Sequence, residues 1–539
     1  MIEDIDIDID SFDPYPSFRP GQKEAIAQIL DLHEKGHKII ELSAPTASGK
    51  SLDLFILGKI LTENHDGAFA VYSTPLVALV NQLKQTDAFH EMPTLKGKKN
   101  YLCPFWSRDN EEPYFADDCP FDCWETAIRA SSEYDHKGQL ETICSTCVYQ
   151  QEKAAFMEAR FGATTFARYM IDHNIRDRTS ILLIDESSGL EKTLVDRVTM
   201  KLHPSIDLNN LRQSLVVYLQ MRIEQKNSLE RDIGDKWENR PSNLSKKELK
   251  SWLKDLKELS KQKKECESDI RKSSKAIAHI DYGTPNIIDK DRRFRILEGA
   301  KEFEDLCEDL DLVVLASGTP TTFLLAQDYE TVSIQHPIPL DRRLIYEYPV
   351  GLMNYDKRSE TVLQMAPVIE KLHNKYHRHT IVHCGAYNIA RLIYDHLSPS
   401  VQKETILQDR NDREGSKLRW MNKPNSLFLS VEFVEGLDLK GSEYPMNIIA
   451  KVPFEPIKDE FVIARNDHDN KKRYNVYTAV AVMQAAGRTT RTKDDYSETY
   501  ILDSSWQSFH RRYKKLFHPW FDAACLRCKR LSEVKKYDW

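Results

Sequence analysis

A nine-residue segment, SAPTASGKS, from Ser43 to Ser51, combines residue types that can hold a triphosphate. Gly49 lets the backbone approach a ligand closely, Lys50 supplies a movable cation, and the Ser51 hydroxyl can bind Mg²⁺. Ala44 stands where the simplest form of such a loop has its first glycine. The segment predicts a phosphate-binding loop, with an ordinary polar loop before a capped helix as the alternative.

The elements on both sides of this segment favour the phosphate-binding interpretation. The sequence HKIIEL before it is typical of a short buried strand, and KSLDLFILGKIL after it has apolar residues at helical spacing. A turn from a strand into a helix points backbone N–H groups and the positive end of the helix dipole at one place. We therefore expect the loop to cradle a nucleotide triphosphate at the start of a helix.

Two acidic residues follow a second apolar run. In TSILLIDESS, residues 181–184 are typical of a strand buried on both faces, and Asp185 and Glu186 stand at its end. Ligands of open α/β sheets lie at the carboxyl ends of the strands. We expect Asp185 to hold Mg²⁺ and Glu186 to orient or deprotonate a water molecule that attacks the triphosphate.

Length and composition limit the class of protein. The chain has 539 residues, enough for two to four domains, and 29% of them are charged, which is ordinary for a soluble globular protein. The net charge of -7 gives no global signal for nucleic-acid binding, so a binding groove would have to be local. No apolar run approaches the ~20 residues that span a membrane, and the acidic N-terminus lacks a signal region. We expect a cytoplasmic protein, or one in the nucleoid or nucleus, without membrane contact.

Five of the ten cysteines fall between residues 103 and 147. This density favours a metal or cluster site over unligated thiols, but spacing alone does not separate zinc from an iron–sulfur cluster. The five are Cys103, Cys119, Cys123, Cys144 and Cys147. Near the C-terminus, Cys525 and Cys528 form a lone pair, a pattern that more often has no metal-binding role.

Residues 206–285 form a charged segment with apolar residues three and four positions apart. This spacing predicts two long helices packed as an antiparallel hairpin. Lysine-rich stretches such as KQKKE could contact a phosphate backbone, although a run of charges is usually a solvated face. We favour the solvated face.

An α/β pattern returns after this segment and predicts a second nucleotide-fold lobe. The stretches DLVVLASGTP, HTIVHCGAYNIARLIYDHL and NSLFLSVEFVEGLDLKG each contain a short apolar strand. AVAVMQAAGRTTRT is helical to about Ala486 and then presents Arg488 and Arg491. These arginines could stabilise the charge that builds on a transferring phosphoryl group, or they could be a surface pair.

Taken in order, these segments resemble the superfamily 2 helicases of the XPD/DinG type. The resemblance extends from about Phe18 to Trp520 and rests on seven motifs in sequence. They are FRPGQ at 18–22, APTASGKS at 44–51, STPLVALVNQL from 73, IDESS at 184–188, ASGTP at 316–320, EGLDLKG at 435–441 and QAAGRTTR at 484–491. KGKKNYLC, which ends at Cys103, and CVY at Cys147 also resemble the sequences around the first and last cluster cysteines of that family.

The resemblance implies a role for individual residues. It assigns phosphate and Mg²⁺ binding to Lys50, Ser51 and Asp185, and the hydrolytic water to Glu186. Three residues would reach the γ-phosphate from the second lobe: Gln484, Arg488 and Arg491. The residues expected to seat the nucleotide are Phe18, Gln22, Ala44, Thr46, Ser48, Gly49, Lys50 and Ser51, and those expected to couple it to the DNA groove are Thr74, Thr319 and Asp438.

The resemblance also implies a fold and a division of the chain. It predicts an α/β protein with two RecA-like lobes, an iron–sulfur insert and a helical arch-like insert. The expected ranges are 1–95, 165–205 and 290–335 for the first lobe, 96–164 for the cluster domain, 206–289 for the arch-like insert and 336–539 for the second lobe. A 4Fe-4S cluster would be held by Cys103, Cys119, Cys144 and Cys147, with Cys123 as the substitute for Cys119.

By resemblance, we expect an ATP-driven helicase that translocates 5′ to 3′ on single-stranded DNA or on tailed duplexes. We expect it to serve DNA repair and to act as a monomer. One departure leaves a second possibility open. Ser187 and Ser188 replace the Ala-His pair that usually follows the two acids, so the link from ATP to DNA could differ. The alternative is a nucleotide-dependent clamp or scaffold that holds single-stranded DNA without processive unwinding.

Overall fold

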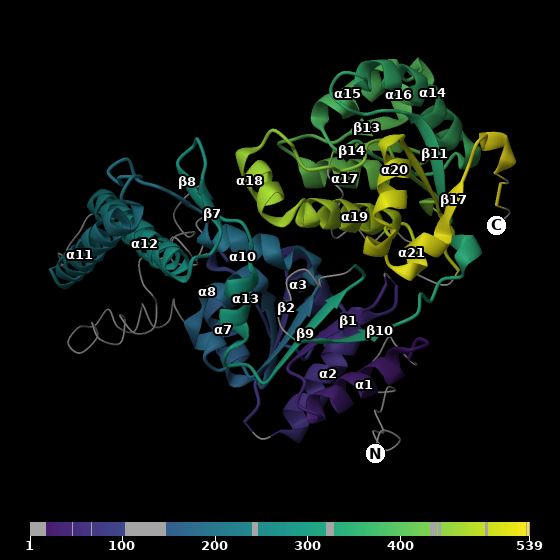
Figure 1. Cartoon of the computed structure of the whole chain (residues 1–539). Helices are drawn as coiled ribbons and strands as arrows, with labels where there is room; N and C mark the ends of the chain where they lie inside the picture. The colour runs from purple at the N-terminus through teal and green to yellow at the C-terminus, as the bar shows by residue number, and fades with distance from the viewer. Residues whose placement is uncertain are drawn as a thin grey trace. The chain divides into compact units, whose positions relative to one another are not determined.

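The computed structural model of the chain describes residues 18–45, 47–65, 67–102, 147–239, 246–319, 328–431, 439, 443–490, 494–534 and 536–537. Most of the predicted cluster segment therefore lies outside the described residues. Figure 1 shows two α/β regions and a pair of long helices.

The first α/β region is built on a seven-stranded sheet with the order β10-β1-β9-β5-β2-β4-β3. The pairings of β1 with β9 and β10, and of β4 with β2 and β3, are parallel. Its strands are β1 (Ile39–Ser43), β2 (Ala70–Thr74), β3 (Thr94–Leu95), β4 (Phe161–Thr165), β5 (Ile181–Asp185), β9 (Leu312–Ser317) and β10 (Glu330–Ser333). All residues of β2, β5 and β9 are buried, as expected for continuous apolar strands covered on both faces.

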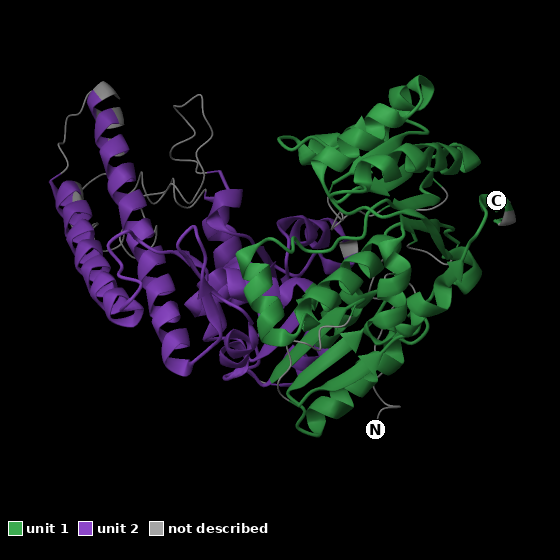
Figure 2. Cartoon of the chain, turned by 45° about the horizontal axis from the view of Figure 1, so that its top comes forward, with its two compact units in different colours: residues 1–57, 184–188, 312–539 green, residues 58–183, 189–311 purple. Residues whose placement is uncertain are grey.

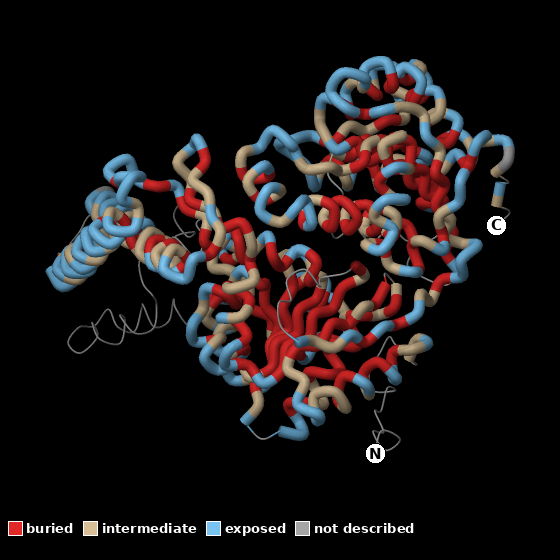
Figure 3. Tube along the Cα trace, viewed as in Figure 1, coloured by how far each residue is buried: buried red, intermediate tan, exposed pale blue. Residues whose placement is uncertain are grey.

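Helices connect these strands and cover the sheet (Figures 1 and 3). They are α1 (Gln22–Glu34), α2 (Lys50–Asn64), α3 (Val77–Gln85), α7 (Val148–Glu158), α8 (Phe166–Ile171), α9 (His173–Arg176), α10 (Leu190–Val198) and α13 (Ala300–Cys307). Because only β9 lies between β1 and β5, the carboxyl ends of β1 and β5 lie two strands apart along the carboxyl-terminal side of the sheet. This topology places the predicted phosphate loop and the predicted acids at the same edge.

The second α/β region has its own seven-stranded parallel sheet, with the order β13-β14-β12-β15-β16-β11-β17. Its strands are β11 (Ile345–Gly351), β12 (Thr380–His383), β13 (Thr405–Leu407), β14 (Leu427–Ser430), β15 (Met446–Ile449), β16 (Glu498–Asp503) and β17 (Cys525–Arg527). Its helices are α14 (Arg358–Tyr376), α15 (Tyr387–His396), α16 (Pro399–Glu404), α17 (Arg413–Asn422), α18 (Glu460–Asp469), α19 (Lys472–Ala486), α20 (Ser505–Arg512) and α21 (Pro519–Ala524).

Alternate residues of this second sheet enter separate cores. Tyr346 and Leu502 belong to one apolar cluster, whereas their neighbours Ile345 and Ile501 belong to another. Side chains of a strand point to opposite faces in turn, so the two clusters are the cores on the two faces of the sheet. Figure 3 shows the buried strands at the centre of both α/β regions. The predicted pair of parallel-sheet α/β lobes is confirmed.

Two long helices, α11 (Leu211–Glu238) and α12 (Lys246–Tyr282), pack against each other within the predicted arch-like segment (Figure 1). Ion pairs between the helices include Lys236 Nζ to Asp255 Oδ2 at 2.9 Å and Lys263 Nζ to Glu230 Oε1 at 3.1 Å. Lys263, which lies in the lysine-rich stretch KQKKE, thus pairs with an acid of the facing helix. Three short strands on either side of this hairpin in the sequence form an antiparallel sheet with the order β6-β8-β7. They are β6 (Met200–Lys201), β7 (Asn286–Ile288) and β8 (Arg293–Ile296).

A buried carboxylate attaches α12 to α13. Glu302 of α13 is 2% exposed, and its Oε1 accepts hydrogen bonds from Lys275 Nζ at 2.6 Å and His279 Nε2 at 3.0 Å. Burial alone would raise the pKa of Glu302, but His279, Lys275 and Arg197 lower this pKa to about 2. The end of α12 is therefore held to α13 by charge as well as by packing.

The chain divides into two compact units (Figure 2). Unit 1 contains residues 1–57, 184–188 and 312–539, and unit 2 contains residues 58–183 and 189–311. The predicted domain ranges follow the sequence motifs instead and stay predictions. No described helix is long and apolar enough to cross a membrane.

Candidate nucleotide-binding site

The predicted phosphate loop lies between β1 and α2, and its backbone takes two left-handed conformations. Gly49 has φ +97° and Ala47 has φ +70°. A Cβ atom added at Gly49 would lie 2.5 Å from Gln22 Nε2, so this position needs glycine both for its dihedral angle and for space. Thr46 lies outside the described residues.

Arg19, just before α1, and Gln22, the first residue of α1, hold this loop in place. Gln22 Nε2 donates to Asp53 Oδ1 at 2.6 Å and to the Gly49 carbonyl at 3.3 Å, and Arg19 Nη1 donates to the Ala47 carbonyl. Gln22 Oε1 accepts from the Arg19 backbone N–H at 2.6 Å. The FRPGQ motif therefore contacts the loop directly. Phe18 is partly buried, and its contact with a nucleotide stays a prediction.

Two interactions join the loop to the acids that follow β5. Ser51 Oγ donates to Asp185 Oδ2 at 2.8 Å, and Lys50 Nζ lies 3.6 Å from Glu186 Oε1. Lys50 and Asp185 are both buried, with 8% and 6% of their surfaces exposed. Two segments separated by more than a hundred residues thus bring a cation, a hydroxyl and two carboxylates together.

These donors fit a Mg²⁺–triphosphate complex. A hydroxyl and a carboxylate are oxygen ligands of the kind that Mg²⁺ takes, and a lysine can bind the phosphates. Ser48 Oγ is buried and has no hydrogen-bond partner among the described residues, so a phosphate oxygen could satisfy it. Ala44 is fully buried at the end of β1, where its backbone N–H donates to the Ser317 carbonyl at 2.9 Å.

Glu186 has a strained backbone. Its φ is +53°, a left-handed conformation that costs free energy for a residue other than glycine. Its backbone N–H donates to Asp185 Oδ1 at 2.9 Å, which helps to hold this geometry. This left-handed conformation turns the chain directly after β5, at the residue predicted to orient or deprotonate the hydrolytic water.

The two serines that replace Ala-His make separate contacts. Ser187 Oγ donates to the Ala316 carbonyl of β9 at 3.2 Å, and Ser188 Oγ accepts a hydrogen bond from Gln484 Nε2 at 2.9 Å. Gln484 is on α19, which belongs to the second α/β region. Ser188 therefore provides a polar contact between the acid segment and the helix that carries the last motif.

The remaining predicted coupling residues have different positions. Thr74 is fully buried at the end of β2, and Thr319 Oγ1 lies 3.1 Å from Ser317 Oγ, just after β9. Arg488 is partly buried and follows the end of α19, so its approach to the γ-phosphate stays a prediction. Asp438 and Arg491 lie outside the described residues.

From the sequence, no role was predicted for three residues near the loop: Asp53, His518 and Arg19. Asp53 is fully buried, and burial raises its pKa well above its usual value despite the hydrogen bond from Gln22. His518 Nε2 lies 3.0 Å from Ser43 Oγ at the end of β1, although the two residues are 475 positions apart. Arg19 could have been found from its place inside FRPGQ. His518 could not, because its partner is set only by folding.

One of the predicted cluster ligands lies among the described residues. Cys147 is 7% exposed and directly precedes α7, where the positive end of the helix would favour a thiolate. This position is compatible with a cluster ligand. Cys103, Cys119, Cys123 and Cys144 lie outside the described residues, so the choice between Cys119 and Cys123 stays open.

Two family models match the chain. The DEAD/DEAH box helicase model matches residues 19–95, and the helicase C-terminal domain model matches residues 369–524. These ranges include the phosphate loop and α19, respectively. The chain therefore contains a DEAD/DEAH box helicase domain and a helicase C-terminal domain, the two parts of an ATP-hydrolysing helicase.

Two solved structures have a fold similar to that of this chain. A structure titled "XPD_Helicase" matches with a TM-score of 0.59 and 16% identity, covering 95% of this chain and 100% of that one. A second, "XPD_APO", matches with a TM-score of 0.53 and 14% identity, covering 94% and 100%. A search of curated protein sequences found no match. The chain has the fold of these structures, which confirms the predicted fold class.

Proposed function

We propose that the protein is a DNA helicase that hydrolyses ATP and translocates 5′ to 3′ along single-stranded DNA. The observation that carries this proposal is the joining of Lys50, Ser51, Asp185 and Glu186 at one sheet edge. The XPD-type fold supports DNA as the substrate. Its place of action would be the nucleoid or the nucleus, and DNA repair is the process that this fold type favours.

The residues of this site would divide the hydrolysis of ATP among them. Lys50 would bind the phosphates, and Ser51 and Asp185 would hold Mg²⁺, which neutralises charge on the phosphates when bound. Glu186 would accept the proton of the attacking water. Gln484, Arg488 and Arg491 would stabilise the charge of the transferring phosphoryl group from the second lobe.

The contact between Ser188 and Gln484 would couple hydrolysis to movement. Gln484 is on α19 and Ser188 follows the catalytic acids, so a change at the phosphates alters the position of both partners. Closure on ATP and opening after hydrolysis would move one lobe against the other along a strand. A polar side chain at position 188 thus performs the linking role that a histidine has in the usual motif.

The test is strand displacement by anaerobically purified protein on duplexes with either a 5′ or a 3′ single-stranded tail, with and without ATP. Opening of only the 5′-tailed duplex, and only with ATP, supports the proposal. Opening of only the 3′-tailed duplex overturns the direction. ATP hydrolysis on single-stranded DNA without any opening supports the clamp alternative, which the serine at position 188 keeps open.

The proposed 4Fe-4S cluster needs a separate readout. Cys103, Cys119, Cys144 and Cys147 would hold it, with Cys123 in place of Cys119 as the other choice. We expect Cys103→Ser to remove visible absorbance and to lower unwinding more than ATP turnover. The control is Cys307→Ser, a buried cysteine of α13 outside the cluster segment. An unchanged spectrum in Cys103→Ser would count against the cluster.

A further inference from the structure

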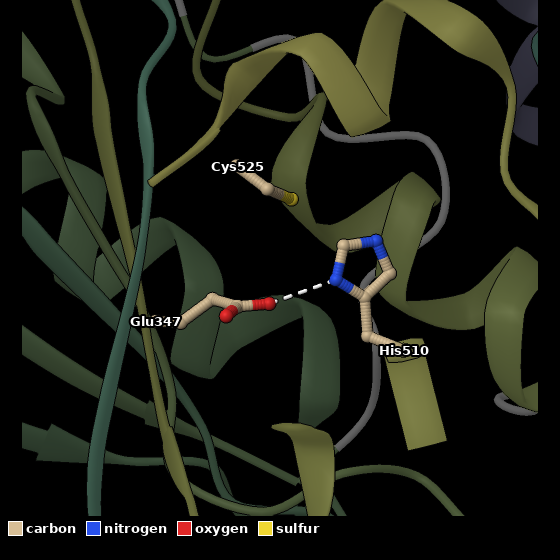
Figure 4. Close-up of side chains that lie close together, drawn as sticks. All are labelled: Glu347, His510 and Cys525. Carbon is tan, nitrogen blue, oxygen red and sulfur yellow. Dashed lines mark hydrogen bonds and ion pairs between the residues drawn. The ribbon is translucent and has the colours of Figure 1, made fainter. Parts of the chain in front are cut away.

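Three possible metal ligands from three elements converge at the edge of the second sheet. They are Glu347 of β11, His510 of α20 and Cys525 of β17, and each offers a ligand atom within 4.8 Å of the other two. Figure 4 shows the thiol, the imidazole and the carboxylate facing one another. None of the three belongs to the nucleotide site or to the cluster segment.

The strand register places the carboxylate and the thiol on one face of the sheet. Ile345 of β11 is paired with Cys525 of β17, and Glu347 is paired with Arg527. Because residues two apart in a strand point to the same side, Glu347 and Cys525 share a face. Cys525 packs against the core cluster that contains Ile345, whereas Cys528 belongs to the cluster on the opposite face. The two cysteines therefore do not act as a pair.

The side chain of Trp506 orients both Glu347 and His510. Trp506 Nε1 donates to Glu347 Oε1 at 2.9 Å, and His510 Nδ1 lies 2.8 Å from the same oxygen. The His510 ring stacks on Trp506 with 4.9 Å between ring centroids and 15° between planes. Packing thus fixes the imidazole with Nδ1 toward Glu347 and Cys525.

A second carboxylate stands behind the imidazole. Asp522 Oδ1 lies 3.3 Å from His510 Nε2, and Lys514 Nζ lies 3.0 Å from Asp522 Oδ2. The approach to Nε2 is within ion-pair distance but does not meet hydrogen-bond geometry. A histidine that binds a metal through one nitrogen commonly donates its other N–H to a carboxylate. Asp522 has that position.

The ligand types select the kind of cation. Thiolate, imidazole and carboxylate together suit Zn²⁺, whereas Mg²⁺ and Ca²⁺ prefer oxygen ligands alone. Three protein ligands would leave a fourth tetrahedral position for a water molecule. Binding would release the thiol proton and leave the thiolate, the carboxylate and the neutral imidazole around the ion.

We propose that Glu347, His510 and Cys525 bind one Zn²⁺ ion, with Asp522 orienting His510. The ion would join β17 and α20, which are near each other in sequence, to β11, whose Glu347 lies 163 positions before His510. Such an ion binds the folded chain and not the unfolded chain, so it would stabilise the C-terminal edge of the second sheet.

The test uses the full chain, freed of loosely bound metal by chelation and then titrated with Co²⁺ as a spectroscopic substitute for Zn²⁺. Wild-type protein should bind one equivalent more than Cys525→Ser and show a thiolate-to-cobalt absorption band that this variant lacks. The matched control is Cys528→Ser, which removes the thiol on the opposite face and should keep the band. The difference between variants removes any contribution from the cysteines at 103–147.

Two further variants keep the test independent of the cysteine. Glu347→Gln preserves an oxygen that can accept from Trp506, and should also lose the additional equivalent. Asp522→Asn should weaken binding about 10- to 100-fold without abolishing it. Equal stoichiometry and equal spectra in wild type, Cys525→Ser and Glu347→Gln would overturn the proposal and leave the group as an ion-paired tether only.

Discussion

The two sheets of this protein each contain a strand, a glycine turn and a helix, but the side chains that follow the two glycines differ. In the first, β1 leads through Gly49 to Lys50 and Ser51 at the start of α2. In the second, β12 leads through Gly385, with φ +70°, to α15, which begins Tyr-Asn-Ile. The second turn has the backbone freedom without the cation and the hydroxyl. We therefore predict phosphate binding at the first turn and not at the second.

The largest expected effect comes from removing the cation of the first turn. Lys50→Ala should reduce ATP turnover at least ~100-fold, because a charge that stabilises the phosphates is lost from a buried site. The measurement is phosphate release in the presence of single-stranded DNA, with circular dichroism to verify the fold.

The matched control for this lysine is in the second sheet. Lys451 is the second residue after β15, and its Cδ would lie 3.7 Å from a Cβ atom added at Gly385. Lys451→Ala should retain basal ATP turnover close to the wild-type rate. Turnover retained in Lys50→Ala, or lost equally in both variants, would contradict the assignment of phosphate binding to the first turn alone.

The two glycines give the next comparison. Gly49→Ala adds a Cβ that collides with Gln22 in a left-handed backbone, so it should cost about 1–3 kcal/mol of unfolding free energy and weaken nucleotide binding. Gly385→Ala has the same strain in φ but only an ordinary contact, so its cost should be about 1 kcal/mol. Urea unfolding and fluorescent-nucleotide titration measure the two effects. A larger loss of nucleotide affinity in Gly385→Ala than in Gly49→Ala would contradict the assignment of nucleotide binding to the first turn.

A smaller effect is expected at the polar contact between Ser188 and Gln484. Ser188→Ala should lower unwinding several-fold more than ATP turnover, and a double-mutant cycle with Gln484→Ala should give a coupling of about 0.5–1.5 kcal/mol. The control is Ser187→Ala, which removes a hydrogen bond to β9 instead. Additive effects of Ser188→Ala and Gln484→Ala on unwinding would show that the contact does not couple them.

The smallest effect is a pH dependence from two partly buried histidines, His336 and His518. Burial, followed by the charge of Arg343, lowers the pKa of His336 to about 3, and burial also lowers the pKa of His518. Because the unfolded chain binds these protons more readily, stability should be fully present above about pH 6.5 and fall as pH decreases toward 3. Urea unfolding across this range should show a shallower slope in His336→Asn. An unchanged slope would mean that other groups cause the loss.

Local patterns predicted the elements of the nucleotide site well. The strand before the loop, the helix after it and the strand that ends at Asp185 are all present, because each depends on hydrophobic spacing within a few residues. The long helices at 211–238 and 246–282 were predicted for the same reason. The joining of Ser51 to Asp185 followed from the rule that ligands lie at the carboxyl ends of parallel strands.

Other features depended on partners that are distant in the sequence. The contact of His518 with Ser43, and that of Gln484 with Ser188, join segments hundreds of residues apart. The spacing of Cys525 and Cys528 suggested at most a weak pair, and the strand register separates them onto opposite faces. A two-residue spacing in sequence cannot show which neighbour each thiol meets.

The sequence by itself determined the phosphate loop, its two acids, the parallel-sheet class and the helical hairpin, because backbone geometry and side-chain periodicity act over short distances. The tertiary structure alone decided which side chains from separate segments meet: Gln22 at Gly49, Gln484 at Ser188, and Glu347 and His510 at Cys525. Such meetings depend on strand order and register, which many weak apolar contacts set together across the whole core.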